Sequence, residues 1–194
     1  MCGRYALHAN PDVIALQFGL DCVPEFKPSF NVAPAASVLV VRKAGELARW
    51  GLRGKFVNLR AETVLARFRA SGRCLVPASG FYEWKSEGRR KQPYYFRPAS
   101  EPLLALAAVW ERDTCSLITT EPNAVVAKVH DRMPLLIPRD AHALWLDPSS
   151  RLEDVLKLAE RPPALDIAPV GFGVNDPRKD DETLIAPLDE SVER

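Results

Sequence analysis

Apolar residues gather in many short runs along the chain, and most of these runs have the character of β-strands. Val38–Arg42 and Glu46–Leu52 lie on either side of a turn at Ala44–Gly45, which predicts a β-hairpin. The run Ala124–Val129 is too short for its spacing to separate strand from helix. Further strands are predicted at Cys74–Pro77, Phe81–Lys85, Tyr94–Arg97, Leu103–Glu111, Ser116–Thr120, Leu135–Ile137 and Ile167–Val174.

Helical spacing is rarer. Ala61–Ala70 places Val64, Leu65 and Phe68 on one face and is followed by Gly72, which predicts a helix. Shorter helices are predicted at Ala141–Leu146 and Leu152–Ala159, with Asp140 and Ser150 as cap or first-turn residues, and a charged loop at Asn175–Glu182. Many short strands with few helices predict an α+β single domain over residues 1–194, with a mixed or barrel-like β-sheet and peripheral short helices.

The composition is that of an ordinary globular protein and excludes the disordered and collagen-like classes, since 47% of the 194 residues are hydrophobic and 26% are charged. The longest apolar stretch, Pro102–Trp110, is far shorter than the roughly 20 residues of a membrane span. The N-terminus has no signal-peptide pattern, so we expect a cytoplasmic protein with no membrane partner. The four cysteines form no C-x-x-C pair, which argues against a zinc ribbon and favours reduced thiols.

The charges are unevenly distributed, although the net charge is only +1. Between Arg42 and Arg97 lie 14 of the 26 basic residues but only four of the 25 acidic residues. A basic segment in a neutral protein is typical of a one-sided phosphate-binding face. The same count also fits strands whose charges alternate between faces and are simply solvated, and the count alone favours that second interpretation.

Cys2 is the first candidate for chemistry. Removal of Met1 would leave Cys2 with a free α-amine beside its own thiol, and the usual pKa values of these groups, about 7.7–8.0 and about 8.5, leave part of each as free nucleophile near neutrality. Such an aminothiol condenses with an aldehyde to an imine and then closes a five-membered thiazolidine ring, helped by the tethered sulfur. Taken alone, Cys2 is also compatible with an ordinary residue in a frayed terminus.

Three further residues have a suitable setting for chemistry. Asn58 precedes Arg60 and Glu62 at a strand-to-helix junction, which ordinary helix capping also explains. Glu83 would share a strand face with Phe81, where loss of solvent raises the pKa of a carboxyl and suits it to acid–base catalysis; a surface pair with Lys85 is the alternative. His130 stands among charged residues before an apolar strand and is a candidate proton shuttle.

The chain resembles the SOS-response-associated peptidase (SRAP) family, whose members attach covalently to abasic sites in single-stranded DNA. The similarity spans nearly the whole chain and weakens after Val174–Asn175. The matching segments are, in order, Met1–Tyr5, Phe30–Pro34, Trp50–Gly51, Asn58–Thr63, Arg73–Pro77, Gly80–Lys85, Leu117–Thr120 and His130–Pro134.

The resemblance implies a role for each matching residue. Cys2 corresponds to the residue that attacks the ring-opened sugar, and Asn58 to the asparagine that positions the Cys2 backbone and the sugar. Glu83 corresponds to the glutamate that moves protons on the sugar oxygen and the imine, and His130 to the histidine that assists ring opening and, in some members, reversal of the crosslink. The expected DNA contacts are Arg4, Arg60, Trp50 and Thr120.

The resemblance also implies an enzyme that forms a DNA–protein crosslink, with abasic single-stranded DNA as its partner. It requires no metal and no organic cofactor, and we expect a monomer. One departure from the family pattern is the short segment Leu52–Val57 between Gly51 and Asn58, where members commonly have a longer, aromatic segment. A wedge beside the lesion would then have to come from Trp50 or Phe56.

Two other functions use the same residues. A cysteine peptidase or N-terminal-nucleophile hydrolase would use Cys2 with His130 as base and Asn58 as orienter, but it has no need of a free α-amine or a basic segment. A non-enzymatic reader of nucleic acid would bind through the Arg42–Arg97 segment and would not depend on Cys2. The family motifs favour crosslinking over both.

Overall fold

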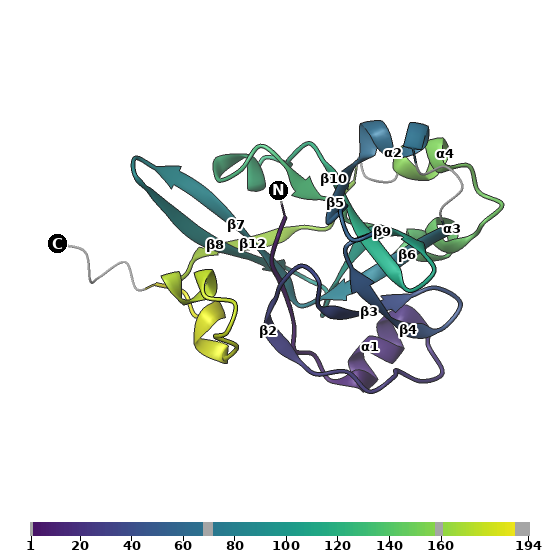
Figure 1. Ribbon diagram of the computed structural model, residues 1–194, viewed down its shortest axis with the longest axis horizontal. Helices are drawn as coiled ribbons and strands as arrows, with labels where there is room; N and C mark the ends of the chain where they lie inside the picture. Colours follow the sequence, from purple (N-terminus) through teal and green to yellow (C-terminus); the bar gives the residue numbers. More distant parts are fainter. Residues whose placement is uncertain (1, 68–71, 158–160, 189–194) are drawn as a thin grey trace.

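Figure 1 shows the computed structural model of the chain, which describes residues 2–67, 72–157 and 161–188. The strands are β1 Tyr5–Leu7, β2 Ser29–Val32, β3 Ser37–Val41, β4 Gly45–Trp50, β5 Asn58–Arg60, β6 Gly72–Ala78, β7 Gly80–Glu87, β8 Arg90–Pro98, β9 Leu104–Glu111, β10 Thr114–Thr120, β11 Met133–Pro134 and β12 Leu165–Pro169. The α-helices are α1 Pro11–Phe18, α2 Ala61–Arg67, α3 His142–Leu146 and α4 Leu152–Leu156. The 3₁₀ turns are η1 Val126–Lys128, η2 Arg139–Ala141, η4 Phe172–Asn175 and η5 Glu182–Ile185.

One of the two sheets closes into a barrel. Its strands follow the order β11-β10-β4-β3-β6-β9, and β9 also pairs with β10, so that β10, β4, β3, β6 and β9 form a ring. Most of these pairings are antiparallel, but β10 runs parallel to both β4 and β5. These pairings confirm the predicted α+β class with a mixed, barrel-like sheet. A closed ring also leaves no exposed edge among its five strands.

The second sheet stands beside the barrel. It has the order β12-β8-β7-β1-β2, and the β7–β8 hairpin extends away from the body of the molecule (Figure 1). Strand β1 pairs with β2 on one side and with β7 on the other, so the N-terminal residues run through the middle of the protein. The helices α2, α3 and α4 lie at the opposite end from the hairpin, and α1 lies below the barrel in this view (Figure 1).

Strand β7 shows how the sequence directs packing. Phe81 is fully buried in the main core and stacks on Phe96 at 4.9 Å, whereas Tyr82 packs with Tyr95 in a separate cluster on the other face. Strand side chains alternate between faces, which puts Glu83 on the core side with Phe81. The predicted division of this strand, with Phe81 and Glu83 opposite Tyr82 and Trp84, is confirmed. The first residue of β7, Gly80, has to be a glycine, because a Cβ there would lie 2.4 Å from the Phe96 carbonyl oxygen.

Most predicted strands are confirmed with shifted ends, and the hairpin predicted around Ala44–Gly45 is β3–β4. Two predictions near the C-terminal half are wrong in part. The predicted strand 135–137 contributes only a single bridge, from Leu136 to Leu106, and the predicted strand 167–174 stops at Pro169 before η4. The ambiguous run 124–129 contains η1, and the predicted loop 175–182 ends where η5 begins.

The predicted helices are also confirmed only in part. The predicted helix 61–70 is described as far as Arg67, and its last residues, like the end of the predicted helix 152–159, lie outside the described residues. Asp140 lies in the first turn of η2, which leads into α3. Neither Asp140 nor Ser150 is a side-chain cap, because the N-cap positions of α3 and α4 are Ala141 and Arg151 and neither makes a capping bond. Helix α1 was not predicted, although Asn10 caps the Asp12 N–H at 2.8 Å, Pro11 occupies the first turn and Gly19 ends the helix with a φ of 65°.

Candidate active site at the junction of the two sheets

Cys2 lies just before β1 and is completely buried. Its Sγ approaches the Arg4 carbonyl oxygen at 3.9 Å. Burial raises the pKa of the Cys2 thiol well above its usual value, and the negative charge of Glu83 raises it further. The sulfur is therefore a neutral thiol near pH 7, held next to an acidic side chain.

Asn58 holds the N-terminal segment in place. It stands at the start of β5, which runs parallel to β10, and its Nδ2 donates to the Cys2 carbonyl oxygen at 2.6 Å. Its Oδ1 is buried and has no hydrogen-bond partner in the part of the chain that the structure describes. A buried amide oxygen of this kind is costly unless a ligand or another donor reaches it.

Glu83 faces the same place from the other sheet. Its side chain is only 1% exposed, on β7 opposite Tyr94 of β8. Burial raises the pKa of Glu83 to about 7, since the desolvated carboxylate is disfavoured. A carboxyl with this pKa exchanges a proton readily at neutral pH, which is the property a general acid–base group needs.

His130 completes the group. Its Nε2 lies 3.8 Å from Glu83 Oε2, and its Nδ1 accepts the backbone N–H of Arg132 at 3.0 Å. Burial lowers the pKa of His130, and the Asp131 carboxylate, 2.9 Å from Nδ1, opposes that change. Because the Arg132 N–H donates to the Nδ1 lone pair, we assign the proton of the neutral ring to Nε2, facing Glu83; the Asp131 carboxylate favours the protonated ring, in which Nδ1 also carries a proton.

The loop of His130 is tied down by Arg132. The Arg132 guanidinium binds both carboxylate oxygens of Glu62 in α2, at 2.8 and 3.0 Å, and also donates to the Thr119 carbonyl oxygen at 2.7 Å. A bidentate pair fixes direction as well as distance. Glu62, an acidic residue in the first turn of α2, thus links the Asn58 segment to the His130 loop.

Glu83 and His130 open onto a cleft of about 830 Å³. It is lined by Glu83, Trp84, Arg90, Lys91, His130, Phe172 and Asn175. Sequence reasoning had singled out Glu83 and His130 but not the other five. The hairpin pairing that brings Arg90 and Lys91 to the cleft, and the turn that brings Phe172 beside them, leave no local signature in the sequence.

The residues predicted to contact DNA differ in how far they are exposed and in what they bond to. Arg60 is exposed at the end of β5, and Thr120 is half-buried at the end of β10, one residue beyond the Thr119 that pairs with Arg60. Arg4 is half-buried, and its Nη1 donates to Asn31 Oδ1 at 2.7 Å and to the Val174 carbonyl oxygen at 3.0 Å. Arg4, just before β1, thus bonds to both β2 and η4.

Trp50 is a packing residue in place of the expected DNA contact. Only 1% of it is exposed, its ring meets Tyr5 edge-on at 5.4 Å, and its Nε1 donates to the Val57 carbonyl oxygen at 2.9 Å. A DNA base could reach this ring only if the core opened. The segment 52–57 is a tight turn closed by bonds between Leu52 and Phe56, and Phe56 packs partly against the core. Neither aromatic residue forms a protruding wedge.

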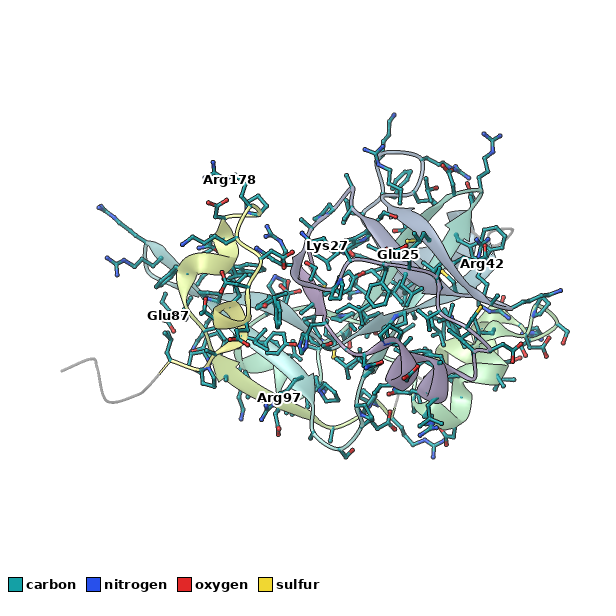
Figure 2. The ribbon with its side chains drawn as sticks, turned by 90° about the horizontal axis from the view of Figure 1, so that it is seen from below. Glu25, Lys27, Arg42, Glu87, Arg97 and Arg178 are labelled. Atoms are coloured by element: carbon teal, nitrogen blue, oxygen red, sulfur yellow. The ribbon has the colours of Figure 1, made fainter. Side chains whose placement is uncertain are left out.

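The basic segment is spread over the surface. Figure 2 shows Arg42 at one end of the molecule and Arg97 well away from it. Arg42 pairs with Glu46 and stacks over the Trp110 ring at 3.9 Å, and Arg73 donates to three backbone carbonyl oxygens, those of residues 145, 147 and 150. Much of the positive charge counted from the sequence therefore supports the fold, and the basic residues at the cleft are the subset that matters for the site.

Among residues 2–67, 72–157 and 161–188 there is no group of three or more His, Cys, Asp and Glu side chains arranged to hold a metal ion. Within the same ranges, no helix has the length and apolar character needed to cross a membrane.

A family model described as "SOS response associated peptidase (SRAP)" matches residues 1–177. The chain belongs to the SRAP family. One relative of this SRAP chain is the abasic site processing protein YoaM of Bacillus subtilis, 36% identical over 81% of this chain and 84% of YoaM. The abasic site processing protein YoqW of the same organism is 33% identical over 95% of this chain and 99% of YoqW. The Escherichia coli protein YedK, also named an abasic site processing protein, is 27% identical over 75% of this chain and 79% of YedK.

Solved structures share the fold of this SRAP chain. A protein from Bacteroides thetaiotaomicron superposes with a TM-score of 0.85 and 21% identity, covering 96% of this chain and all of that one. A phage-related protein from Bordetella bronchiseptica gives a TM-score of 0.69 at 25% identity, covering 87% and 94%. These solved structures therefore share the overall fold of the chain.

Proposed function

We propose that this SRAP chain processes abasic sites by forming a covalent link between Cys2 and the abasic sugar of single-stranded DNA. The observation that carries the proposal is the convergence of four residues from four separate segments: Asn58 bonds to Cys2, the charge of Glu83 acts on the Cys2 thiol, and His130 lies 3.8 Å from Glu83. The names of the relatives support the substrate class. The position of cysteine as second residue supports the chemistry, because loss of Met1 would leave both nucleophiles of Cys2 free.

The reaction joins one aldehyde to two nucleophiles. The ring-opened abasic deoxyribose carries an aldehyde at C1′, and the α-amine of Cys2 adds to it to give a carbinolamine. Protonation of the hydroxyl releases one water and leaves an iminium ion. The Cys2 sulfur loses its proton and adds to C1′, which closes a thiazolidine. Attack is favoured by proximity, since both nucleophiles belong to one residue.

Glu83 is suited to move the protons of both steps. In its neutral form it supplies the proton that leaves with water, and the resulting carboxylate accepts the thiol proton, which restores the starting state. Its pKa of about 7 allows both forms near neutrality. A neutral thiol such as that of Cys2 needs a base of this kind.

His130 and Asn58 orient the reacting groups. The Nε2–H assigned to His130 points toward the Glu83 carboxyl, so both can share a substrate oxygen during opening of the sugar ring. The Asn58 amide fixes the Cys2 carbonyl, and its unpartnered Oδ1 is available to the Cys2 amine or a sugar hydroxyl. Arg60, Thr120 and Arg4 remain the proposed contacts to the flanking phosphates, which position the strand without reading its sequence.

The peptidase alternative fits less well. A catalytic cysteine of that class works as a thiolate with a lowered pKa, paired with a histidine. Burial and the charge of Glu83 raise the Cys2 pKa instead, and His130 faces Glu83. This is the environment of a thiol that reacts late, after an amine has already captured the substrate.

The test is denaturing gel electrophoresis of the protein mixed with a single-stranded oligonucleotide that holds one abasic site. We expect a shifted band with the damaged strand and none with an undamaged strand. Cys2→Ala should abolish the band yet retain weak, salt-sensitive DNA binding. The matched control is Cys22→Ala, because Cys22 is the exposed cysteine and should be dispensable. A band that survives Cys2→Ala, or no band from protein whose intact mass proves loss of Met1, would overturn the proposal.

A further inference from the structure

The cleft continues well past the reacting groups. Glu83 and His130 form one part of its lining, and the remainder comes from the β7–β8 hairpin and from η4. Its volume of about 830 Å³ lies toward the upper end of the roughly 300–1,000 Å³ of small-molecule sites, so it has room for more than a single sugar. The outer part contains two aromatic residues and two basic residues, Trp84, Phe172, Arg90 and Lys91.

The walls of this outer part are held rigidly. Trp84 Nε1 donates to Asn175 Oδ1 at 2.8 Å, which joins β7 to η4 across the base of the cleft. Gln92 Nε2 donates to the Val170 carbonyl oxygen at 2.8 Å, and Asn31 Nδ2 donates to the carbonyl oxygens of Asp176 and Lys179 at 3.0 and 2.7 Å. The segment that carries Phe172 is therefore anchored on both sides, so the cleft exists before any ligand binds.

In the described part of the chain, Phe172 is the only aromatic residue among the large apolar side chains that remain exposed. It remains 46% exposed although the residues around it are bonded into the fold, and its exposed side lines the cleft.

The two basic residues of the cleft lie on the projecting β7–β8 hairpin (Figure 1). Near its tip, Lys91 is opposite Ser86 and Arg90 is opposite Glu87. Burial is the main cause of the lowered pKa of His130, and the positive charge of Lys91 adds to it, which places Lys91 within electrostatic reach of the catalytic group.

We propose that this hairpin cleft binds the unpaired nucleotide next to the abasic site, with its base stacked on Phe172 and its phosphate held by Lys91 and Arg90. The proposal rests on the proposed function. Aromatic rings beside cations are the usual arrangement for single-stranded nucleic acid, because every base has a flat face and every nucleotide a phosphate. The neighbouring base has lost its stacking partner at the abasic site, and an aromatic ring replaces that partner.

The proposal predicts an effect on binding rather than on chemistry. Phe172 is not placed at the aldehyde, so its loss should raise the DNA concentration that gives half the maximal crosslinking rate and leave the maximal rate unchanged. Stacking on one ring is lost in Phe172→Ala, for which we expect roughly a 5–150-fold increase in that concentration. Because stacking does not distinguish bases, the increase should be similar for all four neighbours of the lesion.

The decisive experiment pairs the variant with a matching change in the DNA. One neighbouring nucleotide, first on the 5′ side and then on the 3′ side, is replaced by a tetrahydrofuran spacer, which has neither base nor aldehyde. On one side the wild type should lose affinity to the level of Phe172→Ala, and Phe172→Ala should lose nothing more. Additive losses on both sides would show that no base stacks on Phe172 and would overturn the proposal.

Phosphate binding is tested in the same way. Lys91→Gln should make the negative slope of log affinity against log salt shallower by about 0.7, the value for one contact to a single strand. Lys43→Gln, in the turn between β3 and β4, and Leu144→Ala, whose side chain is 45% exposed on α3, are the matched controls and should change nothing. An unchanged slope in Lys91→Gln would contradict the assignment. Failure of the wild type to crosslink any abasic strand would instead reject the proposed function.

Discussion

The side-chain amide of Asn58 donates a hydrogen bond of 2.6 Å to the main-chain carbonyl oxygen of Cys2. Asn58 belongs to the strand beside the barrel, whereas Cys2 leads into the second sheet. The bond therefore fixes the N-terminal nucleophile relative to groups on both sheets. It also explains why an asparagine, with an NH2 donor group and an acceptor oxygen on the same amide, suits this position better than a carboxylate, which has no donor.

Asn58→Asp tests this bond. A carboxylate in place of the amide would put an acceptor against the Cys2 carbonyl oxygen and repel it, so we expect the maximal crosslinking rate to fall by about 10²-fold, the cost of a small misplacement of a reacting group. Rates at saturating DNA, compared with those of the wild type, provide the measurement. A normal rate in Asn58→Asp would mean that the bond does not position Cys2.

Glu83→Gln removes the proton transfer and keeps the shape of the side chain. We expect crosslinking to slow by about 10²–10⁴-fold, the usual contribution of a general acid–base group. Glu87→Gln, on the exposed part of the same strand, is the matched control and should react at the wild-type rate. If Glu83→Gln also reacted at that rate, Glu83 would have no part in the proton transfers.

Burial of Glu83 also predicts a pH-dependent stability. Its pKa is about 7 in the folded protein against an ordinary 4.5, so the folded state binds the proton more tightly than the unfolded state. The stabilisation from the neutral carboxyl is complete below pH 4.5 and is lost as the pH rises toward and past 7, on the order of 3 kcal/mol in all at about 1.4 kcal/mol per pKa unit.

Urea unfolding of wild type and Glu83→Gln at pH 5 and pH 8 measures this effect. The glutamine cannot ionise, so the free energy of unfolding of the wild type, relative to that of Glu83→Gln, should decrease from pH 5 to pH 8. A difference between the two proteins that is the same at both pH values would show that the Glu83 carboxyl is not desolvated.

The environment of His130 predicts its titration. Burial lowers the pKa of this histidine, and the Asp131 carboxylate partly offsets that effect. Asp131→Ala should therefore lower the pKa of His130 further. Nitrogen chemical shifts in an NMR titration would report both the pKa and the tautomer, which we expect to carry its proton on Nε2. A proton on Nδ1 at neutral pH would contradict the bond from the Arg132 N–H.

Arg60→Ala should weaken DNA binding by a similar factor for every sequence, because phosphate contacts carry no base information. Arg60 is exposed beside Asn58 on β5, so its removal leaves the core intact. Binding to a set of single strands of different sequence is the measurement. A loss that depends on the neighbouring base would point to a different role for Arg60.

The sequence predicted the parts of the protein that local patterns control. The turn at Ala44–Gly45 predicted β3–β4, and alternation along β7 put Glu83 on the side of Phe81. Trp50 was assigned to the surface because nothing local distinguishes an aromatic residue that packs on Tyr5 from one that meets DNA. Helix α1 was missed because its signals are capping signals and Val13 and Leu16 remain exposed, which weakens the apolar pattern.

The charge count could not identify the cations at the cleft for a related reason. Positive residues in one stretch of sequence end on different parts of the molecule because successive strands turn back on themselves, as Arg42 and Arg97 show in Figure 2. Position along the chain does not reveal which cations meet a carboxylate or a carbonyl. Conversely, Phe172 and Lys91 lie far apart in sequence and line one cleft only because the hairpin and η4 are bonded together.

The central claim is that both nucleophiles of Cys2 join the abasic sugar. Mass spectrometry of the N-terminal peptide from the purified crosslink, after nuclease and protease digestion and treatment with a thiol-alkylating reagent, tests it most directly. The account predicts a peptide that begins at Cys2, carries the sugar remnant minus one water, and takes up no alkylating group on Cys2. A remnant on another residue, or an adduct whose Cys2 thiol is still alkylated, would contradict it.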